Sequence, residues 1–392
     1  MEFGLSDDQK LLVDTLSRAL ADTVSVDTIR GSDPAHVRDD PLWRQIVEFG
    51  VPSLLVPEQF GGLGLSLLDA ALVSECLGAA AAPVPHIGAS VLAPLALTLA
   101  GSAAQQAKWL PRIASGNVAF GVAISEHAAG VRGDAGVVRT AERLTGIARF
   151  ALDAAGADAF IVADLEGGLH LVAADAPGVT IEPVATIDRT RGIAHLKLDN
   201  VAGEPLGEGV AGHALRRMIE AGRIMLAADT LGAASVMIDK AVAYSLERKQ
   251  FDRIVGSFQA VKHLSAEMVA ELEPCRSLIW YAAHSFDALP DECAVMSAHA
   301  KSLTDEAGRF VARTATEVHG GIGFTDLLGL HFWFKRIGLN RQLLGGPEYV
   351  RQEIAGLLGW GTSRGASACS ALDRMPDYVA IERSTAFGRL TP

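Results

Sequence analysis

Residues 213–246, HALRRMIEAGRIMLAADTLGAASVMIDKAVAYSL, decide the fold of this chain. Apolar residues recur in this stretch at positions i, i+3, i+4 and i+7, a spacing typical of a helix that packs against other helices. Three later stretches, 258–287, 291–318 and 340–358, have the same spacing. Four such helices predict an antiparallel four-helix bundle over residues 213–360, and an apolar-rich bundle often forms oligomers through its faces.

Upstream of the predicted bundle the pattern changes. Over residues 119–212, short apolar runs are separated by Gly, Asp and Pro, which predicts a central β domain of several short strands. The clearest runs are 120–124, 159–163, 169–173 and 194–198. Residues 1–118 predict a helical domain that opens with Ser6 as N-cap and acidic residues in the first turn. The fold class is therefore α+β and mostly α, with an irregular tail over 361–392.

Composition excludes several classes of protein. Of the 392 residues, 49% are hydrophobic and 20% are charged, which excludes a disordered chain, and a net charge of -12 argues against a nucleic-acid partner. No secretory signal is visible in residues 1–10, and the apolar stretch 90–100 is shorter than the roughly 20 residues that span a bilayer. We expect a cytoplasmic protein without a membrane span. The sequence has no CxxC pair that would predict a metal site. The cysteines are therefore expected to be buried thiols: Cys76, Cys275, Cys293 and Cys369.

Three stretches match motifs of one family, in the family's order. Residues 247–251 (ERKQF) with FQ at 258–259 resemble the RxxF…Q segment of FAD-dependent acyl-CoA dehydrogenases. Residues 317–325 (EVHGGIGFT) resemble their QxxGGxGxT segment, and residues 124–130 (ISEHAAG) resemble their TEPxAGSD strand. The resemblance extends along essentially the whole chain. It includes LSDDQ at 5–9, PEQFGGLGL at 57–65 and Arg336.

The resemblance implies a set of flavin-binding residues. In the family, the first two motifs reach the adenosine diphosphate half of an FAD held by a neighbouring subunit. An arginine fork suits the pyrophosphate, and a glycine turn lets the backbone approach it closely. Each motif alone also fits an ordinary surface arginine or a plain turn between helices. The implied cofactor-binding residues are Arg248, Gln250, Phe251, Gln259, Glu317, Gly320, Gly321 and, from the third motif, Ser125.

The reaction of the family requires a carboxylate that removes the α-proton of an acyl thioester, while the flavin takes the β-hydrogen as hydride. Gly345 and Gly222 occupy the two positions where family members carry this glutamate. Glu220 and Glu348 are the nearest substitutes, but moving one or two residues along a helix rotates a side chain by about 100–200°. Arg223, beside Gly222, matches a residue near the CoA-facing mouth or is an ordinary helix arginine.

The part of the site that would serve the chain's own flavin ring also departs from the family. RFAL at 149–152 stands where the family has a Trp-x-Ser/Thr turn. Val131 and Arg132 replace the Ser and Asp of the AGSD motif. Apolar side chains at these positions would remove hydrogen bonds that hold the ring.

This asymmetry predicts the function. The half that reaches across to a neighbour's cofactor survives, so the chain resembles the partner subunit of a two-chain bacterial acyl-CoA dehydrogenase, such as those of steroid side-chain degradation. We expect an α2β2 heterotetramer with FAD, an acyl-CoA substrate and electron-transfer flavoprotein as acceptor. One alternative is a self-sufficient homotetramer whose base is Glu220 or Glu348. The other is a non-redox scaffold or binding member of the family.

Overall fold

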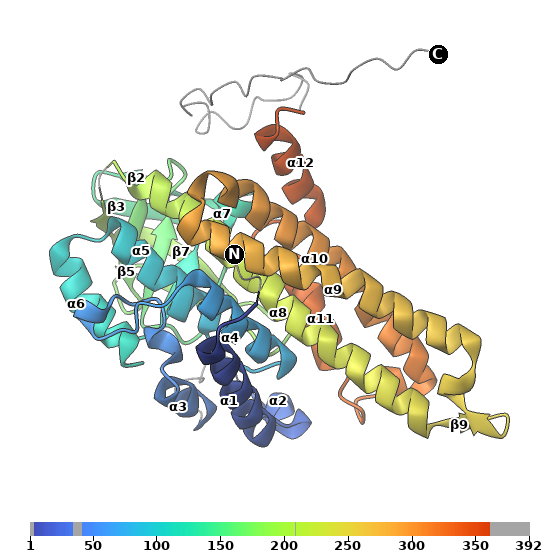
Figure 1. Ribbon diagram of the computed structural model, residues 1–392. Coiled ribbons are helices and arrows are strands. Elements are labelled where there is room, and N and C mark those ends of the chain that lie inside the picture. The colour runs from blue at the N-terminus through green and yellow to red at the C-terminus, as the bar shows by residue number, and fades with distance from the viewer. Residues whose placement is uncertain (1–3, 34–40, 208, 361–392) are drawn as a thin grey trace, which may run out of the picture.

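The computed structural model describes residues 4–33, 41–207 and 209–360 (Figure 1). The chain begins with helices whose order and caps follow the sequence pattern. Ser6 caps the first helix by accepting a hydrogen bond from the Gln9 backbone N–H, while the Gln9 side chain accepts one from Ser6, which confirms the predicted N-cap. The helices of this part are α1 (Asp7–Thr23), α2 (Val26–Gly31), α3 (Pro41–Glu48), α4 (Leu67–Ala79), α5 (Ala93–Ala100) and α6 (Ala103–Ala114), with a π-helical turn η4 (Ile87–Leu92) before α5.

The central part consists of two four-stranded sheets that share one core. The first sheet has the order β1-β4-β5-β8, with β1 and β4 parallel, and the second is antiparallel with the order β2-β3-β7-β6. Inward-facing residues of both sheets, such as Val137, Phe160 and Leu196, form one cluster. Burial alternates along β7 of the second sheet, whereas β1 and β4 of the first sheet are buried on both faces. The elements are β1 (Phe120–Ala123), α7 (Ser125–Ala129), β2 (Gly136–Thr140), β3 (Arg143–Ala151), β4 (Ala159–Ala163), β5 (Leu169–Ala173), β6 (Val179–Pro183), β7 (Ala194–Ala202) and β8 (Glu204–Leu206).

Long helices form the C-terminal part. α8 (Ala211–Glu247) and α9 (Gln259–Ala288) are joined by the hairpin β9 (Lys249–Gln250) and β10 (Arg253–Ile254), and α10 (Pro290–His319) follows. The prediction of one helix over 340–358 was wrong. The structure has α11 (His331–Asn340) and α12 (Pro347–Leu357) instead. Gly345 has a φ of 101° and Pro347 starts α12, so the chain between them cannot continue a helix.

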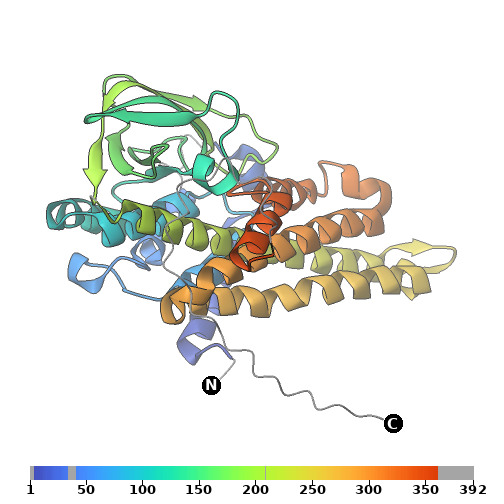
Figure 2. The ribbon, with the colours of Figure 1, turned by 90° about the horizontal axis from the view of Figure 1, so that it is seen from above.

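α8 is the core element of the molecule. It packs against α4, α9, α10 and α11, and most of its residues are buried (Figures 1 and 2). It is long and apolar enough to cross a membrane by length and composition alone, but 89% of the relevant window is buried inside the protein, as in a core helix. Figure 2 shows the β domain over one end of α8 and the β9–β10 hairpin at the other end.

The thiols follow the prediction where the structure describes them. Cys76, Cys275 and Cys293 are free and buried. Burial raises the pKa of Cys293 to about 12 and that of Cys76 to about 11, so both stay protonated and unreactive at neutral pH. Cys369 lies outside the described residues.

Candidate functional site

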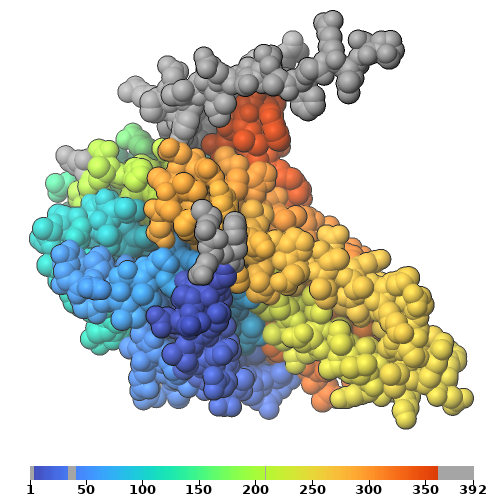
Figure 3. Space-filling model, in the orientation of Figure 1, coloured from blue at the N-terminus to red at the C-terminus, as the bar shows by residue number. Residues whose placement is uncertain are grey.

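A two-residue turn lies at the far end of the bundle, between α8 and α9 (Figures 1 and 3). Gln250 pairs with Arg253, and the turn residues Phe251 and Asp252 have φ angles of 52° and 60°. A left-handed backbone favours Asn or Gly, and costs another residue roughly 1–2 kcal/mol. Phe251 is nevertheless 86% exposed, and its ring makes an edge contact only with Phe258, at 6.2 Å, among the described residues. The chain therefore strains its backbone to present an aromatic ring to the outside.

The polar residues of the same motif also face outward. Arg248 is the C-cap of α8, and its guanidinium has no hydrogen-bond or ion-pair partner among the described residues. The Gln250 amide donates to the Lys249 carbonyl at 2.9 Å, and the Gln259 amide lies 2.8 Å from the His263 ring. These side chains are exposed, so donors for an external anion are available at this end.

The glycine turn η6 (Gly320–Phe324) follows α10, after Glu317, which is exposed on the last turn of that helix. A Cβ at Gly321 would meet no atom within 4 Å, whereas a Cβ at Gly323 would lie 2.7 Å from the Thr316 carbonyl oxygen. Gly320 has a φ of 64°, but Gly321 has no left-handed backbone. Gly323 and Gly320 are therefore required by this chain's own fold. Gly321 leaves space that nothing in the described chain uses.

A ring stack joins the two motifs. The Tyr244 ring lies on the His319 ring with centroids 4.8 Å apart, and His319 Nδ1 donates to the Ala315 carbonyl at 2.7 Å. The Arg248 backbone N–H donates to the Tyr244 carbonyl at 2.9 Å, and Gly320 directly follows His319. The structure thus brings the arginine–phenylalanine hairpin and the glycine turn to one end of the bundle, although about 70 residues separate them.

The third motif lies in the β domain, where its hydroxyl is already used. Ser125 begins α7 and its Oγ donates to the Phe150 carbonyl at 3.0 Å. Phe150 has a φ of 55°, and its backbone N–H donates to His195 Nδ1 at 3.1 Å. Burial lowers the pKa of His195, which favours the neutral ring that this hydrogen bond requires. The Ser125 proton therefore closes a local network and does not point to an external acceptor.

A small pocket opens beside Ser125. Its empty space, open solvent included, is only about 200 Å³. Arg149 forms an ion pair with Asp134, and the Arg132 guanidinium lies 5.8 Å from the centre of the Phe150 ring. Two arginines and a phenylalanine thus border the place that the family resemblance assigns to the chain's own flavin ring. The pocket is lined by Ser125, Glu126, Ala129, Gly130, Arg132, Arg149 and Phe150.

The two positions of the family's catalytic glutamate both lie next to Leu344, Gly222 in space and Gly345 in the chain. A Cβ at Gly222 on α8 would lie 2.4 Å from Leu344 Cδ1, and Leu344 directly precedes Gly345. A Cβ at Gly345 would lie 2.8 Å from the Ala128 carbonyl oxygen. Both glycines are buried, as is Leu344. At this place the chain therefore has a leucine and two glycines, and none of these can accept a proton.

The two substitute carboxylates lie elsewhere. Glu220 is buried and paired with Arg217 at 2.6 Å, and the Arg217 guanidinium lies 3.5 Å above the Phe286 ring of α9. Burial raises the pKa of Glu220. Glu348 is exposed and 3.0 Å from Arg341, and its own backbone N–H, followed by Arg341, lowers its pKa. Each is held by an arginine, and within the described part of the chain no hydrogen bond or ion pair joins either carboxylate to Leu344.

Arg223 forms a structural clamp. Its guanidinium binds both oxygens of Glu353 on α12, at 3.0 and 2.7 Å. It also donates to the Leu344 carbonyl at 3.1 Å and to the Ala128 carbonyl at 3.2 Å. With four of its five N–H groups directed at this chain, Arg223 joins α8, α7 and α12. Glu353 was not identified from the sequence, because a half-buried glutamate on a helix has no distinguishing pattern.

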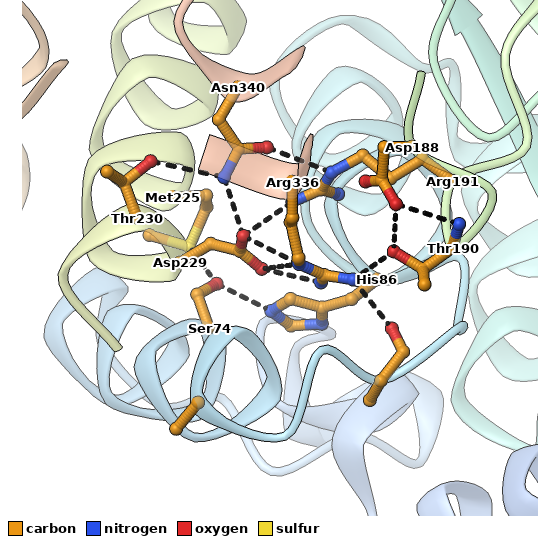
Figure 4. Close-up of polar contacts among 12 residues, drawn as sticks. Ser74, His86, Asp188, Thr190, Arg191, Met225, Asp229, Thr230, Arg336 and Asn340 are labelled. Atoms are coloured by element: carbon orange, nitrogen blue, oxygen red, sulfur yellow. Dashed lines mark hydrogen bonds and ion pairs between the residues drawn. The ribbon is translucent and has the colours of Figure 1, made fainter. Parts of the chain in front are cut away.

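A buried charge network was also missed, apart from Arg336 (Figure 4). Asp229 of α8 pairs with Arg336 of α11 at 2.7 Å and with Arg191 of the β domain at 2.9 Å, and it accepts a hydrogen bond from Asn340 at 2.6 Å. Arg336 also donates to Thr190 at 2.8 Å. Burial alone would raise the pKa of Asp229, but Arg191 and Arg336 outweigh it and hold the pKa well below its usual range. The signal in the sequence was Asp229 as the one charged residue of the apolar run 224–238, where a charge requires a buried partner.

A second buried pair lies on α10. Lys301 and Asp305 are fully buried and in contact, and Lys301 Nζ lies 3.5 Å from the Arg341 carbonyl oxygen. Burial raises the pKa of Asp305 to about 7. Lys301 therefore contacts the start of the loop over 341–346, which Arg223 contacts near its end.

The far end of the bundle and the region around Gly222 differ in what they can do chemically. The far end presents cationic and amide donors, an aromatic face and an open glycine turn, which fit the pyrophosphate-bearing half of a dinucleotide. Around Gly222, the nearby carboxylates of Glu220, Glu348 and Glu353 are each paired with an arginine. Within the described ranges, no group of three or more His, Cys, Asp or Glu side chains is placed to hold a metal ion.

Comparison with known proteins identifies the family. Residues 6–117 match the family model "Acyl-CoA dehydrogenase, N-terminal domain", and residues 211–358 match "Acyl-CoA dehydrogenase, C-terminal domain". The chain is 30% identical to the acyl-CoA dehydrogenase IpdE2 of Mycolicibacterium smegmatis over 346 residues, which cover 88% of this chain and 96% of IpdE2. It is 31% identical to IpdE2 of Mycobacterium tuberculosis over 350 residues, 86% of this chain and 95% of that protein.

Solved structures agree with the predicted α+β fold. A chain of the ChsE4-ChsE5 complex from Mycobacterium tuberculosis superposes with a TM-score of 0.82 at 27% identity, covering 93% of this chain and 100% of that one. A variant of the Tcur3481-Tcur3483 steroid ACAD gives a TM-score of 0.79 at 29% identity, with coverages of 91% and 98%. Sequence motifs, fold and relatives agree, and the chain belongs to the acyl-CoA dehydrogenase family.

Proposed function

We propose that this chain is the non-catalytic subunit of a two-chain, FAD-dependent acyl-CoA dehydrogenase that α,β-desaturates a steroid-type acyl-CoA in the cytoplasm. Its assembly is an α2β2 heterotetramer with a second, complete family member, and electron-transfer flavoprotein is the electron acceptor. The similarity to a steroid ACAD made of Tcur3481 and Tcur3483, and to the ChsE4-ChsE5 complex, supports a two-chain assembly and this substrate class.

The observation that carries the proposal is the filled place at Gly222. Leu344 occupies the space where a side chain at Gly222 would lie, and the Ala128 carbonyl oxygen lies 2.8 Å from the place of a Cβ at Gly345. Desaturation needs a base within hydrogen-bond reach of the α-proton, and the Glu220 and Glu348 carboxylates are each ion-paired with an arginine instead. The complete partner must therefore supply the base, which argues against a self-sufficient homotetramer.

The far end supplies what this chain contributes. FAD, when bound, accepts the hydride that leaves the β-carbon of the acyl group. The Arg248 guanidinium would bind the pyrophosphate of the partner's FAD, and Phe251 would cover an apolar face of the adenosine half. Gln250, Gln259 and Glu317 would make polar contacts, and the backbone at Gly320 and Gly321 would approach the cofactor where no Cβ intervenes.

The first test is co-expression of the chain with a complete family member encoded beside its gene, followed by purification and a visible spectrum. We expect the chain alone to be colourless and the complex to hold flavin and to desaturate an acyl-CoA. A yellow chain that turns over an acyl-CoA by itself would establish the homotetramer instead. A chain that forms no flavin-containing complex with any such partner would favour the scaffold alternative.

Gly321→Val tests the contribution across the interface. A side chain here meets no atom of this chain, so the melting temperature of the chain alone should be unchanged. In the complex, the added side chain should reduce the retained flavin at least tenfold. The matched control is Gly212→Val, at another glycine with nothing within 4 Å, which should retain the normal flavin content. Equal flavin retention in both variants would contradict the proposed role of the glycine turn.

A further inference from the structure

The space beside Gly222 is filled by the chain itself. Besides Leu344 Cδ1 at 2.4 Å, a Cβ at Gly222 would meet Leu92 Cδ2 at 3.5 Å. Leu92 belongs to η4 of the N-terminal part, and Leu344 belongs to the loop between α11 and α12. Both leucines are buried. The Leu344 side chain therefore packs directly against the backbone of α8 at Gly222. A side chain at residue 222 would overlap with it.

Leu344 reaches this position through an unusual backbone. Its φ is 53°, in the left-handed region, and the φ of the next residue, Gly345, is 101°. A leucine rarely adopts this conformation unless the surrounding structure holds it there. The strain at Leu344 therefore needs a specific restraint.

Arg223 provides that restraint. Its Nε donates to the Leu344 carbonyl at 3.1 Å, and its two Nη atoms bind the carboxylate of Glu353. The guanidinium is buried and adjoins Gly222 in the chain. By binding the carbonyl of Leu344, Arg223 fixes the peptide orientation that turns the leucine side chain toward Gly222.

We propose that Leu344 is the residue that excludes an acyl group from this chain, and that Arg223 is the positioning residue that keeps it in place. The proposal rests on the proposed function, because it explains why an acyl thioester enters only the partner's site. It also adds a claim that the loss of a glutamate does not imply. The vestigial acyl site is closed by a side chain, and removing that side chain should open it.

The first experiment is a double-mutant cycle on the full chain. Gly222→Ala should lower the melting temperature in the natural background, because its Cβ would lie 2.4 Å from Leu344 Cδ1. In a Leu344→Ala background the same change should have a clearly smaller effect. Gly308→Ala is the control, since its Cβ would meet Thr230 and Ile337 instead, and its effect should be the same in both backgrounds. A Gly222→Ala effect that is equal in both backgrounds would overturn the proposal.

The second experiment measures binding of octanoyl-CoA to the purified chain without flavin or partner. Leu344→Ala should bind the probe at least tenfold more tightly than the natural chain, and so should Arg223→Gln. A merely structural Arg223 would lower the melting temperature without any gain in binding. Should the alanine variant fail to fold, Leu344→Gly suits the left-handed backbone and replaces it. Natural-chain affinity equal to that of the opened variants would refute the exclusion, whatever the flavin test shows.

Discussion

The far end of the bundle and the region around Gly222 carry motifs of the same reaction, yet they differ in almost every physical respect. At the far end, Phe251 is 86% exposed and Phe324 is 79% exposed. Around Gly222, Leu344 is 1% exposed and Arg223 is 2% exposed. In the first region, Phe251 is exposed and the Arg248 guanidinium has no partner among the described residues. In the second region, Leu344 and Arg223 are buried in contacts within the chain. In the proposed function, the first region serves another subunit's cofactor, and the second is closed to substrate.

The glycines of the two regions, Gly321 at the far end and Gly345 near Gly222, differ in whether the fold requires them. Gly321 has open space beside it and an ordinary backbone, so nothing in the described chain requires a glycine there. Gly345 has a φ of 101° and the Ala128 carbonyl beside it, so the fold itself requires it. A glycine that the fold does not need leaves room for a contact outside the chain, which the proposed function assigns to Gly321. A glycine that the fold needs cannot be returned to a catalytic glutamate by one substitution.

Asp229→Asn should have the largest effect on stability. Asp229 lies two helical turns from Gly222 on α8 and neutralises Arg191 and Arg336, which stay buried when its charge is removed. We expect a loss of about 3–5 kcal/mol in the free energy of unfolding, measured by urea titration. The same substitution at the far end, Asp252→Asn, should change it by less than about 0.5 kcal/mol, because Asp252 is exposed and Asn suits its left-handed backbone. Similar losses in both variants would erase the contrast between the two regions.

Gly345→Glu should have the next largest effect. It restores a carboxylate at the family position but forces a side chain onto a φ of 101° and a Cβ to 2.8 Å from a backbone oxygen. We expect about 3 kcal/mol of destabilisation and no acyl-CoA turnover by the chain alone. Gly321→Glu, at the far end, should stay within about 0.5 kcal/mol of the natural chain. A stable and active Gly345→Glu chain would mean that this region is an intact site lacking only its base.

The sequence predicted the elements that have a local cause. α8, the four strand runs and the Ser6 cap each follow from spacing or from residues within one turn. The apolar spacing over 340–358 predicts one helix, but Gly345-Gly346-Pro347 breaks that helix before α12. Glycine and proline outweigh apolar spacing at this point of the chain.

Contacts between distant segments could not be predicted. The Asp229 network joins residues from the N-terminal helices, the β domain and the bundle, and no periodicity links them. The filling of the Gly222 space by Leu344 depends on a left-handed leucine, which sequence propensity opposes. The sequence alone therefore shows glycines at the two family positions, whereas only the structure shows Leu344 beside Gly222.

Phe251→Asn should have the smallest effect on stability and the most informative effect on assembly. Asparagine tolerates the left-handed backbone better than phenylalanine, so the chain alone should become more stable by up to roughly 1 kcal/mol. In the complex, loss of the exposed ring should lower flavin retention severalfold. Leu11→Gln, which removes an exposed apolar side chain from α1, is the control and should leave retention unchanged. A substitution that improves the free chain and impairs the complex is what a residue maintained for a partner should give. If both properties improve, the exposed ring serves neither the cofactor nor the interface.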